Sequence, residues 1–163
     1  MTAIELIADA CARSLELLKM TVGDFSDADM MARPCPGANH AAWQIGHLVC
    51  SETRMINACR PGTMPELPAG FAEKFTGKTA ASDDRAAFAT KEQLLDLAAR
   101  ARAASVKFVK GLTEKDLNQP GPEKMRAICP TLGHLVMLLP NHAAMHIGQI
   151  QAIRRKLGKP NLF

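Results

Sequence analysis

The sequence predicts an all-α protein built as a four-helix bundle, and three observations support this prediction. Alanine, leucine and methionine dominate the apolar residues, tyrosine is absent, and aromatic residues make up only 4% of the chain. Such a composition favours helices, whereas few segments show the alternation of β-branched residues that is typical of strands. Apolar residues instead recur at helical spacing in long segments that proline and glycine separate. The 163 residues are expected to form one domain, 1–163.

The first half of the chain is expected to contain two long helices. An amphipathic helix is predicted over 4–23, where apolar residues recur every three or four positions. A short capped turn at 26–29 follows, and the prolines and glycine of 34–37 then break the chain. The second helix is predicted over 41–59. The segment 61–84, rich in proline, glycine and threonine, is expected to be a long crossover rather than a tight loop.

The second half is expected to contain the third and fourth helices, over 90–111 and 131–157. Thr90 and Gln93 have the spacing of a capping box, in which each side chain accepts a hydrogen bond from the other residue's backbone. Pro140 lies inside the fourth helix and is expected to kink it locally, because proline has no N–H to donate to the preceding turn.

An internal repeat supports this layout. Residues 25–29 resemble 112–116, and residues 45–49 resemble 132–136, at one shared offset (112 − 25 = 132 − 45 = 87). A shared offset indicates two related helical hairpins. Two such hairpins joined by a long connection make a four-helix bundle.

Charge and cysteine content restrict the functional classes. The net charge of +4 is modest, and no aromatic residues interleave with the basic residues near the C-terminus, so we expect a solvated helix end and no nucleic-acid partner. No apolar run has membrane-spanning length, so no membrane role is expected. The five cysteines form no C-x-x-C pair, which is typical of a reducing, cytoplasmic location.

The most informative motif is a pair of histidines in the fourth helix. His142 and His146 are four residues apart, so on a helix they lie on one face with Cβ atoms about 5–6 Å apart. They share that face with Leu139 and Ile150, which should be buried. Two buried imidazoles need partners, and one metal ion with nitrogen–metal distances of about 2.0–2.1 Å would satisfy both.

A catalytic metal site usually takes a third protein ligand. His134 points about 120° away from His146 on the helical wheel and is expected to be exposed or interfacial. His40 stands at the entrance to the second helix, where we expect a capping role. His47 lies within that helix, but the helix is apolar on two sides, and periodicity does not decide which side meets the fourth helix. His47 is nevertheless the favoured third ligand.

Two motifs carry a resemblance to a known family. Trp43-Gln44-Ile45-Gly46-His47-Leu48 resembles the second-helix signature of the DinB-like (DinB/YfiT) family of metalloenzymes. The fourth-helix signature is similar to the segment 142–150, H-x-x-x-H-I-G-Q-I, followed by R-R-x-L-G at 154–158. The resemblance covers essentially the whole chain in length and helix order.

The resemblance implies a fold, a ligand set and a chemistry. The fold would be a four-helix bundle of up-down-down-up topology with a long crossover between helices 2 and 3. The ligands would be His47, His142 and His146, holding a divalent ion, nickel or zinc. Relatives include transferases and isomerases that use low-molecular-weight thiols, so a small-molecule substrate such as a thiol is implied, and a homodimer would suit the family.

Three further residues near these histidines have side chains that could support a metal site. Cys50 follows His47 by three residues and could ligate a metal, although a small buried hydrophobe is the commoner role. Gln149 follows His146 by three residues and could orient a ligand ring or a bound water, or could merely edge the apolar face. Glu52 could act as an acid or base, but a carboxylate on a helix face is the more frequent case.

Two functional hypotheses follow. The first is a metal-dependent hydrolase or thiol-dependent transferase with an unknown substrate. The chain lacks both the H-E-x-x-H motif of zinc proteases and the Glu-x-x-His motifs of di-iron bundles. The second is a non-catalytic stress-response or binding module in which the histidines hold a structural ion or none.

Overall fold

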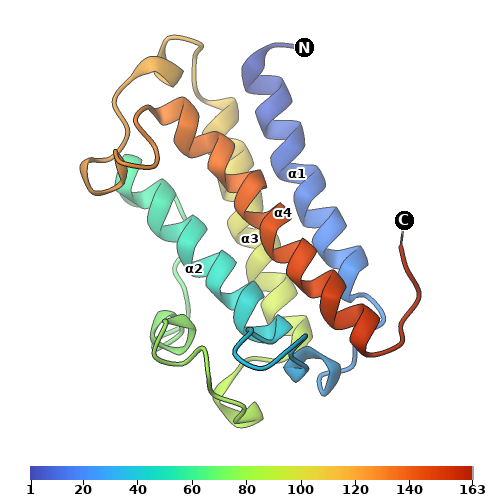
Figure 1. The fold of residues 1–163 in the computed structure, drawn as a ribbon. Coiled ribbons are helices and arrows are strands. Elements are labelled where there is room, and N and C mark those ends of the chain that lie inside the picture. The colour runs from blue at the N-terminus through green and yellow to red at the C-terminus, as the bar shows by residue number, and fades with distance from the viewer. Residues whose placement is uncertain (163) are drawn as a thin grey trace.

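The structure, a computed structural model, describes residues 1–162. Within this range the chain forms four α-helices and no β-strand, which confirms the all-α prediction (Figure 1). The helices are α1 (Ala3–Val22), α2 (Ala41–Cys59), α3 (Lys91–Lys110) and α4 (Leu132–Lys156). Each bound falls within two residues of its predicted position.

The four helices pack around one hydrophobic core. Helices α1 and α2 each pack against both α3 and α4, so the order around the bundle is α1, α3, α2, α4 (Figure 1). Residues that are less than 2% exposed line the interior, among them Ile45, Ile56, Leu94, Leu135 and Ile150. Helices α2 and α4, which carry the histidines, are therefore neighbours.

Each helix begins with a side chain that accepts a hydrogen bond from an otherwise unpaired backbone N–H. Thr2 and Glu5 form a capping box at α1, and Thr90 and Gln93 form the predicted one at α3. Thr131 caps α4, accepting from the backbone N–H of His134. Such caps are typically worth about 1 kcal/mol each, and they fix where each helix starts.

The internal repeat corresponds to a repeated turn. Ser26 and Asp29 exchange side-chain and backbone hydrogen bonds, and Thr113 and Asp116 make the same reciprocal pair. Each pair leads into a short 3₁₀ turn, Asp29–Met31 in the first half and Asp116–Asn118 in the second. The turn after α1 and the turn after α3 are thus built in the same way.

The crossover between α2 and α3 lies against the outer side of α2. It contains two 3₁₀ turns, Ala72–Phe75 (η2) and Arg85–Ala87 (η3). The buried ring of Phe75 lies directly on Gly46 of α2, where a Cβ atom would collide with it. Arg33 fixes the far end of the crossover by donating to the Asp83 carboxylate at 2.7 Å and to three backbone carbonyls.

Helix α4 departs from expectation at its C-terminal end. Arg154 belongs to the basic cluster that was expected to be solvated, yet only 2% of it is exposed. Its guanidinium donates to the Asp24 carboxylate at 2.5 Å and to the carbonyls of Thr21 and Pro160. These bonds tie the end of α4 to the end of α1. The prediction of a solvated helix end is therefore wrong for Arg154.

Helix α4 continues through Pro140 without ending there. Among the described residues, no helix combines the length and the apolar character that crossing a membrane requires.

Candidate metal centre

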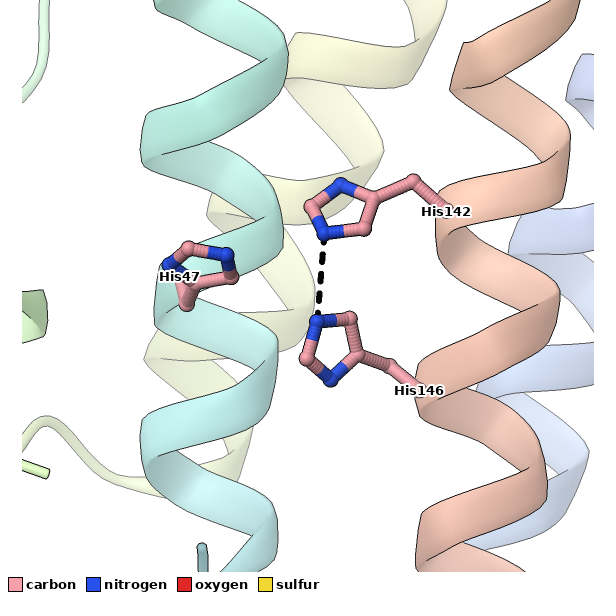
Figure 2. Close-up of side chains that lie close together, drawn as sticks. All are labelled: His47, His142 and His146. Carbon is pink, nitrogen blue, oxygen red and sulfur yellow. Dashed lines mark hydrogen bonds between the residues drawn. The ribbon is translucent and has the colours of Figure 1, made fainter. Parts of the chain in front are cut away.

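Three histidines from two helices come together between α2 and α4. The candidate ligand atoms of His47, His142 and His146 all lie within 4.8 Å of one another. The rings of His142 and His146 project from α4 toward α2, and the ring of His47 lies beside them (Figure 2). The ring centroid of His47 is 5.3 Å from that of His142 and 5.4 Å from that of His146.

The packing of α2 explains why periodicity could not place His47. Ile45 and Val49 face the bundle core and are at most 1% exposed. The opposite apolar side, which includes Trp43, is covered by the crossover: the indole N–H of Trp43 donates to the Thr76 carbonyl and the Thr79 hydroxyl, each at 3.2 Å. Both faces of α2 are therefore buried, and His47 lies between them, where α2 meets α4.

His146 is the most enclosed of the three and has a fixed ring orientation. Only 7% of it is exposed, and its Nδ1–H donates to the side-chain oxygen of Gln44 at 3.0 Å. Gln44 in turn donates to the Asn39 carbonyl at 2.8 Å, which fixes the direction of its amide. With the proton held on Nδ1, the Nε2 lone pair of His146 points at His142. Such a partner on the other ring nitrogen is usual for metal-binding histidines.

The spacing of the α4 pair fits one shared ion. The two Nε2 atoms of His142 and His146 are 3.2 Å apart (Figure 2). Two nitrogens at about 2.0–2.1 Å from one ion, with angles between octahedral and tetrahedral, lie roughly 2.8–3.4 Å apart. His47 would complete the set after a small side-chain adjustment.

Burial keeps the histidines neutral, which metal binding requires. Burial lowers the pKa of His142 and that of His146 to about 4, and the neighbouring histidines push in the same direction. Burial also lowers the pKa of His47, with a smaller opposing effect from the backbone of Phe75. All three rings are therefore neutral at neutral pH, and each keeps one unprotonated nitrogen that can ligate a metal.

The ring of His47 is held from two sides. It stacks on Trp43 with centroids 4.8 Å apart and an interplanar angle of 8°. Its Nε2 lies 3.4 Å from the hydroxyl oxygen of Ser51, one turn further along α2. These contacts restrict the orientation of the ring, and neither contacting group is charged.

His47 also lines a cleft between α2 and the crossover, with a volume of ≈ 610 Å³. The α2 wall is formed by Trp43, His47, Cys50, Ser51 and Arg54, and the crossover wall by residues 72, 73 and 75–77. This size falls within the usual range of small-molecule sites. Of the three clustered histidines, His47 is the one that lines this cleft, so a ligand in the cleft meets the cluster at His47.

The structure gives the two residues considered as supporting groups different surroundings. Cys50 lines the cleft but is not among the three clustered ligands, and burial raises the pKa of its thiol to about 11. Gln149 is exposed and has only a minor effect on His146, tending to raise its pKa. Gln44 also contacts His146 and orients its ring through Nδ1. Sequence reasoning missed it, although Gln44 stands three positions before His47 and so shares its side of α2.

The remaining polar candidates lie outside the cluster. Glu52 is turned into the core, where its carboxylate accepts from Arg102 of α3 at 3.1 Å. His134 is exposed and its Nδ1 contacts the Thr131 hydroxyl at 2.7 Å. His40 is fully buried and caps α2, its Nδ1 accepting from the Trp43 backbone N–H at 3.0 Å, as expected.

Comparisons with known proteins agree with this architecture. A crystal structure of a conserved protein from Enterococcus faecalis superposes with a TM-score of 0.74, covering 98% of this chain and 99% of that chain at 21% sequence identity. At this identity the likeness shows a shared fold. No curated protein matched the sequence. The sequence profile of the DinB superfamily matches residues 10–150, most of the chain and all three histidines. The chain therefore belongs to the DinB superfamily.

Proposed function

We propose that this protein is a divalent-metal-dependent enzyme with His47, His142 and His146 as its metal ligands. The observation that carries the proposal is the convergence of three imidazoles, all kept neutral by burial, with ligand atoms within 4.8 Å of one another. Nitrogen ligands of this kind suit zinc and nickel. The family resemblance favours the same two metals.

Three protein ligands leave a coordination position for a substrate. A bound divalent ion would supply a Lewis acid that brings the pKa of water or a thiol toward neutrality. This chemistry suits hydrolysis or thiol transfer. The chain's own residues position the site: Gln44 orients His146, Trp43 holds the ring of His47, and the cleft admits a small molecule.

The decisive measurement is the metal content of purified protein. Protein prepared with nickel and zinc available should carry about one ion per chain, and His142→Ala should lose it, because two nitrogens rarely hold such an ion alone. His134→Ala is the matched control, since this exposed histidine of the same helix lies outside the cluster. An empty site in the unmodified protein would overturn the proposal.

The same proposal includes the wider features implied by the family resemblance. These are one domain over 1–163, a cytoplasmic location, a homodimer, and a small-molecule substrate such as a low-molecular-weight thiol. The up-down-down-up topology is supported by the run of colour in Figure 1, where α1 and α4 descend while α2 and α3 ascend.

The second candidate is a non-catalytic module with a structural ion. It is favoured by the position of Glu52, which pairs with Arg102 in the core and so supplies no carboxylate to the histidines. Thermal melting with and without chelator separates the two candidates. A large fall in Tm on chelation, together with no turnover of thiol or ester substrates, would support the structural role.

A further inference from the structure

The cleft beside His47 contains an arginine that forms no ion pair with a carboxylate among the described residues. Arg54 lines the cleft and is exposed, and no ion pair involves it among residues 1–162. Most of the other arginines among the described residues form an ion pair with a carboxylate, as Arg33 does with Asp83 and Arg85 with Asp27. An unpaired guanidinium in a cleft is available to bind an anionic ligand bidentately.

Arg54 is placed so that one ligand in the cleft can reach both it and His47. His47, Ser51 and Arg54 follow one another at spacings of four and three residues, so they lie in a row along one face of α2. The backbone distance from His47 to Arg54 is two turns, about 10 Å. Long side chains on a helix lean toward its N-terminus, so the guanidinium of Arg54 lies closer to the ring of His47 than the two backbones do. A small molecule can therefore span the two groups.

The electrostatics of the site support the same arrangement. The charge of Arg54 adds a minor part to the burial-driven lowering of the His47 pKa, and it opposes the rise that burial causes in the pKa of Cys50, so its field extends over the α2 wall of the cleft. The other wall carries Glu73, which also lines the cleft and also forms no ion pair with Arg54. An anionic group in the cleft is therefore attracted to the α2 wall and repelled from the crossover wall.

We propose that the cleft binds small molecules that carry a carboxylate, with the carboxylate held by Arg54 and the reacting group directed to the histidine cluster past His47. This inference rests on the proposed function, because it assigns a substrate class to the same site. Ser51 lies between the two anchor points and can donate its hydroxyl to the ligand. Glu73 repels the carboxylate of the ligand from the crossover wall. This repulsion favours the orientation in which that carboxylate faces Arg54.

Trp43 offers a direct measure of ligand binding. It is the only tryptophan, the chain has no tyrosine, and the indole lines the cleft. Zinc-loaded full-length protein is titrated with 3-mercaptopropionate and with its neutral analogue 3-mercapto-1-propanol while Trp43 emission is followed. The carboxylate probe should bind roughly tenfold more tightly, the range expected of a charge-assisted pair in a partly exposed site. Equal affinities for the two probes would overturn the proposal.

Three substitutions sharpen the experiment. Arg54→Gln should abolish the preference for the carboxylate while leaving the affinity for the neutral probe within about twofold. Glu73→Gln should strengthen carboxylate binding, because it removes the repelling charge. Arg155→Gln removes the same charge from an exposed position of α4 outside the cleft, and should leave the tenfold ratio intact. A ratio that survives Arg54→Gln, or that falls equally in Arg155→Gln, contradicts the proposal.

Metal content distinguishes this inference from the proposed function. Zinc analysis of each variant is made before the titration. A protein that takes up no zinc removes the metalloenzyme proposal itself. A protein that holds about one zinc ion per chain but shows no carboxylate preference keeps the metalloenzyme proposal and removes only the role of Arg54.

Discussion

At the scale of single residues, the candidate site depends on side chains that hold other side chains in place. Gln44 accepts from the Nδ1–H of His146 and donates to the Asn39 carbonyl, so it links the ring to the entrance of α2. Trp43 links the ring of His47 to the crossover, because its indole stacks on that ring and donates a hydrogen bond to the Thr76 carbonyl. These contacts restrict the rings of His146 and His47 before any ion binds, which lowers the entropy lost on binding.

Removal of the Gln44 amide should weaken metal binding. Gln44→Leu leaves His146 free to change its tautomer and ring orientation, and losses of about 10–100-fold in affinity are usual for such partners. Competition with a zinc chelator measures this. Gln149→Leu, at an exposed position of α4, is the control and should change the affinity little. A larger effect at Gln149 than at Gln44 would contradict the assignment.

His40 should make stability depend on pH. Burial and the charge of Arg33 lower the pKa of His40 to about 4 in the folded state, from 6.5. Above pH 6.5 both states are neutral. Between pH 6.5 and 4 the unfolded chain binds a proton that the folded chain excludes, so stability falls as the pH falls, by up to about 3 kcal/mol in total.

The test is urea unfolding at a series of pH values. His40→Asn keeps a capping acceptor without a titrating ring, so this variant should lose less stability than the unmodified protein between pH 6.5 and 4. His134→Asn, at an exposed position, serves as the control. Superimposable curves for His40→Asn and the unmodified protein would show that His40 is not the source.

At the scale of elements, Gly46 couples the crossover to α2. Phe75 packs where a Cβ of Gly46 would stand, whereas Gly148 of α4 has open space at the same place. Gly46→Ala should therefore lower the free energy of unfolding by about 1–3 kcal/mol despite its better helix propensity. Gly148→Ala should raise it by up to about 1 kcal/mol. Chemical denaturation of both variants tests the contrast, which fails if both become more stable.

The helices could be predicted from sequence, while the position of the site on α2 could not. A helix cap or a helix-breaking proline acts on residues that are its neighbours in the chain, so Thr90, Gln93 and the prolines mark the helix ends in the sequence itself. The face of α2 that carries His47 is decided by distant residues, because the crossover covers a second apolar side with Phe75 and binds Trp43. The role of Gln44 could not be predicted for the same reason, since its partner His146 is 102 positions away.

At the scale of the whole molecule, one ion pair is buried in the core. Glu52 of α2 and Arg102 of α3 are each 6% exposed and 3.1 Å apart, and one oxygen and one nitrogen of the pair have no hydrogen-bond partner. Burial raises the pKa of Glu52 against the opposing effect of Arg102. Such a pair contributes little net stability, because removing two charges from water offsets their attraction.

Replacing one partner should therefore cost far more than replacing both. Arg102→Met leaves a buried carboxylate and should lower the free energy of unfolding by about 3–5 kcal/mol, whereas the double variant Glu52→Met/Arg102→Met should be near neutral or more stable. Arg100→Met breaks the exposed pair with Asp96 on the same helix and should cost less than about 1 kcal/mol. A double variant as unstable as Arg102→Met would contradict this account.

The histidine cluster joins two helices that are far apart in the sequence, and this has a consequence for degradation. An ion held by His47 and the α4 pair would act as a removable staple across most of the chain, since local opening of either helix would require its release. Protease susceptibility of the segments between α2 and α4 would then report on cellular metal supply: a metal-starved cell would clear the protein faster than a replete one.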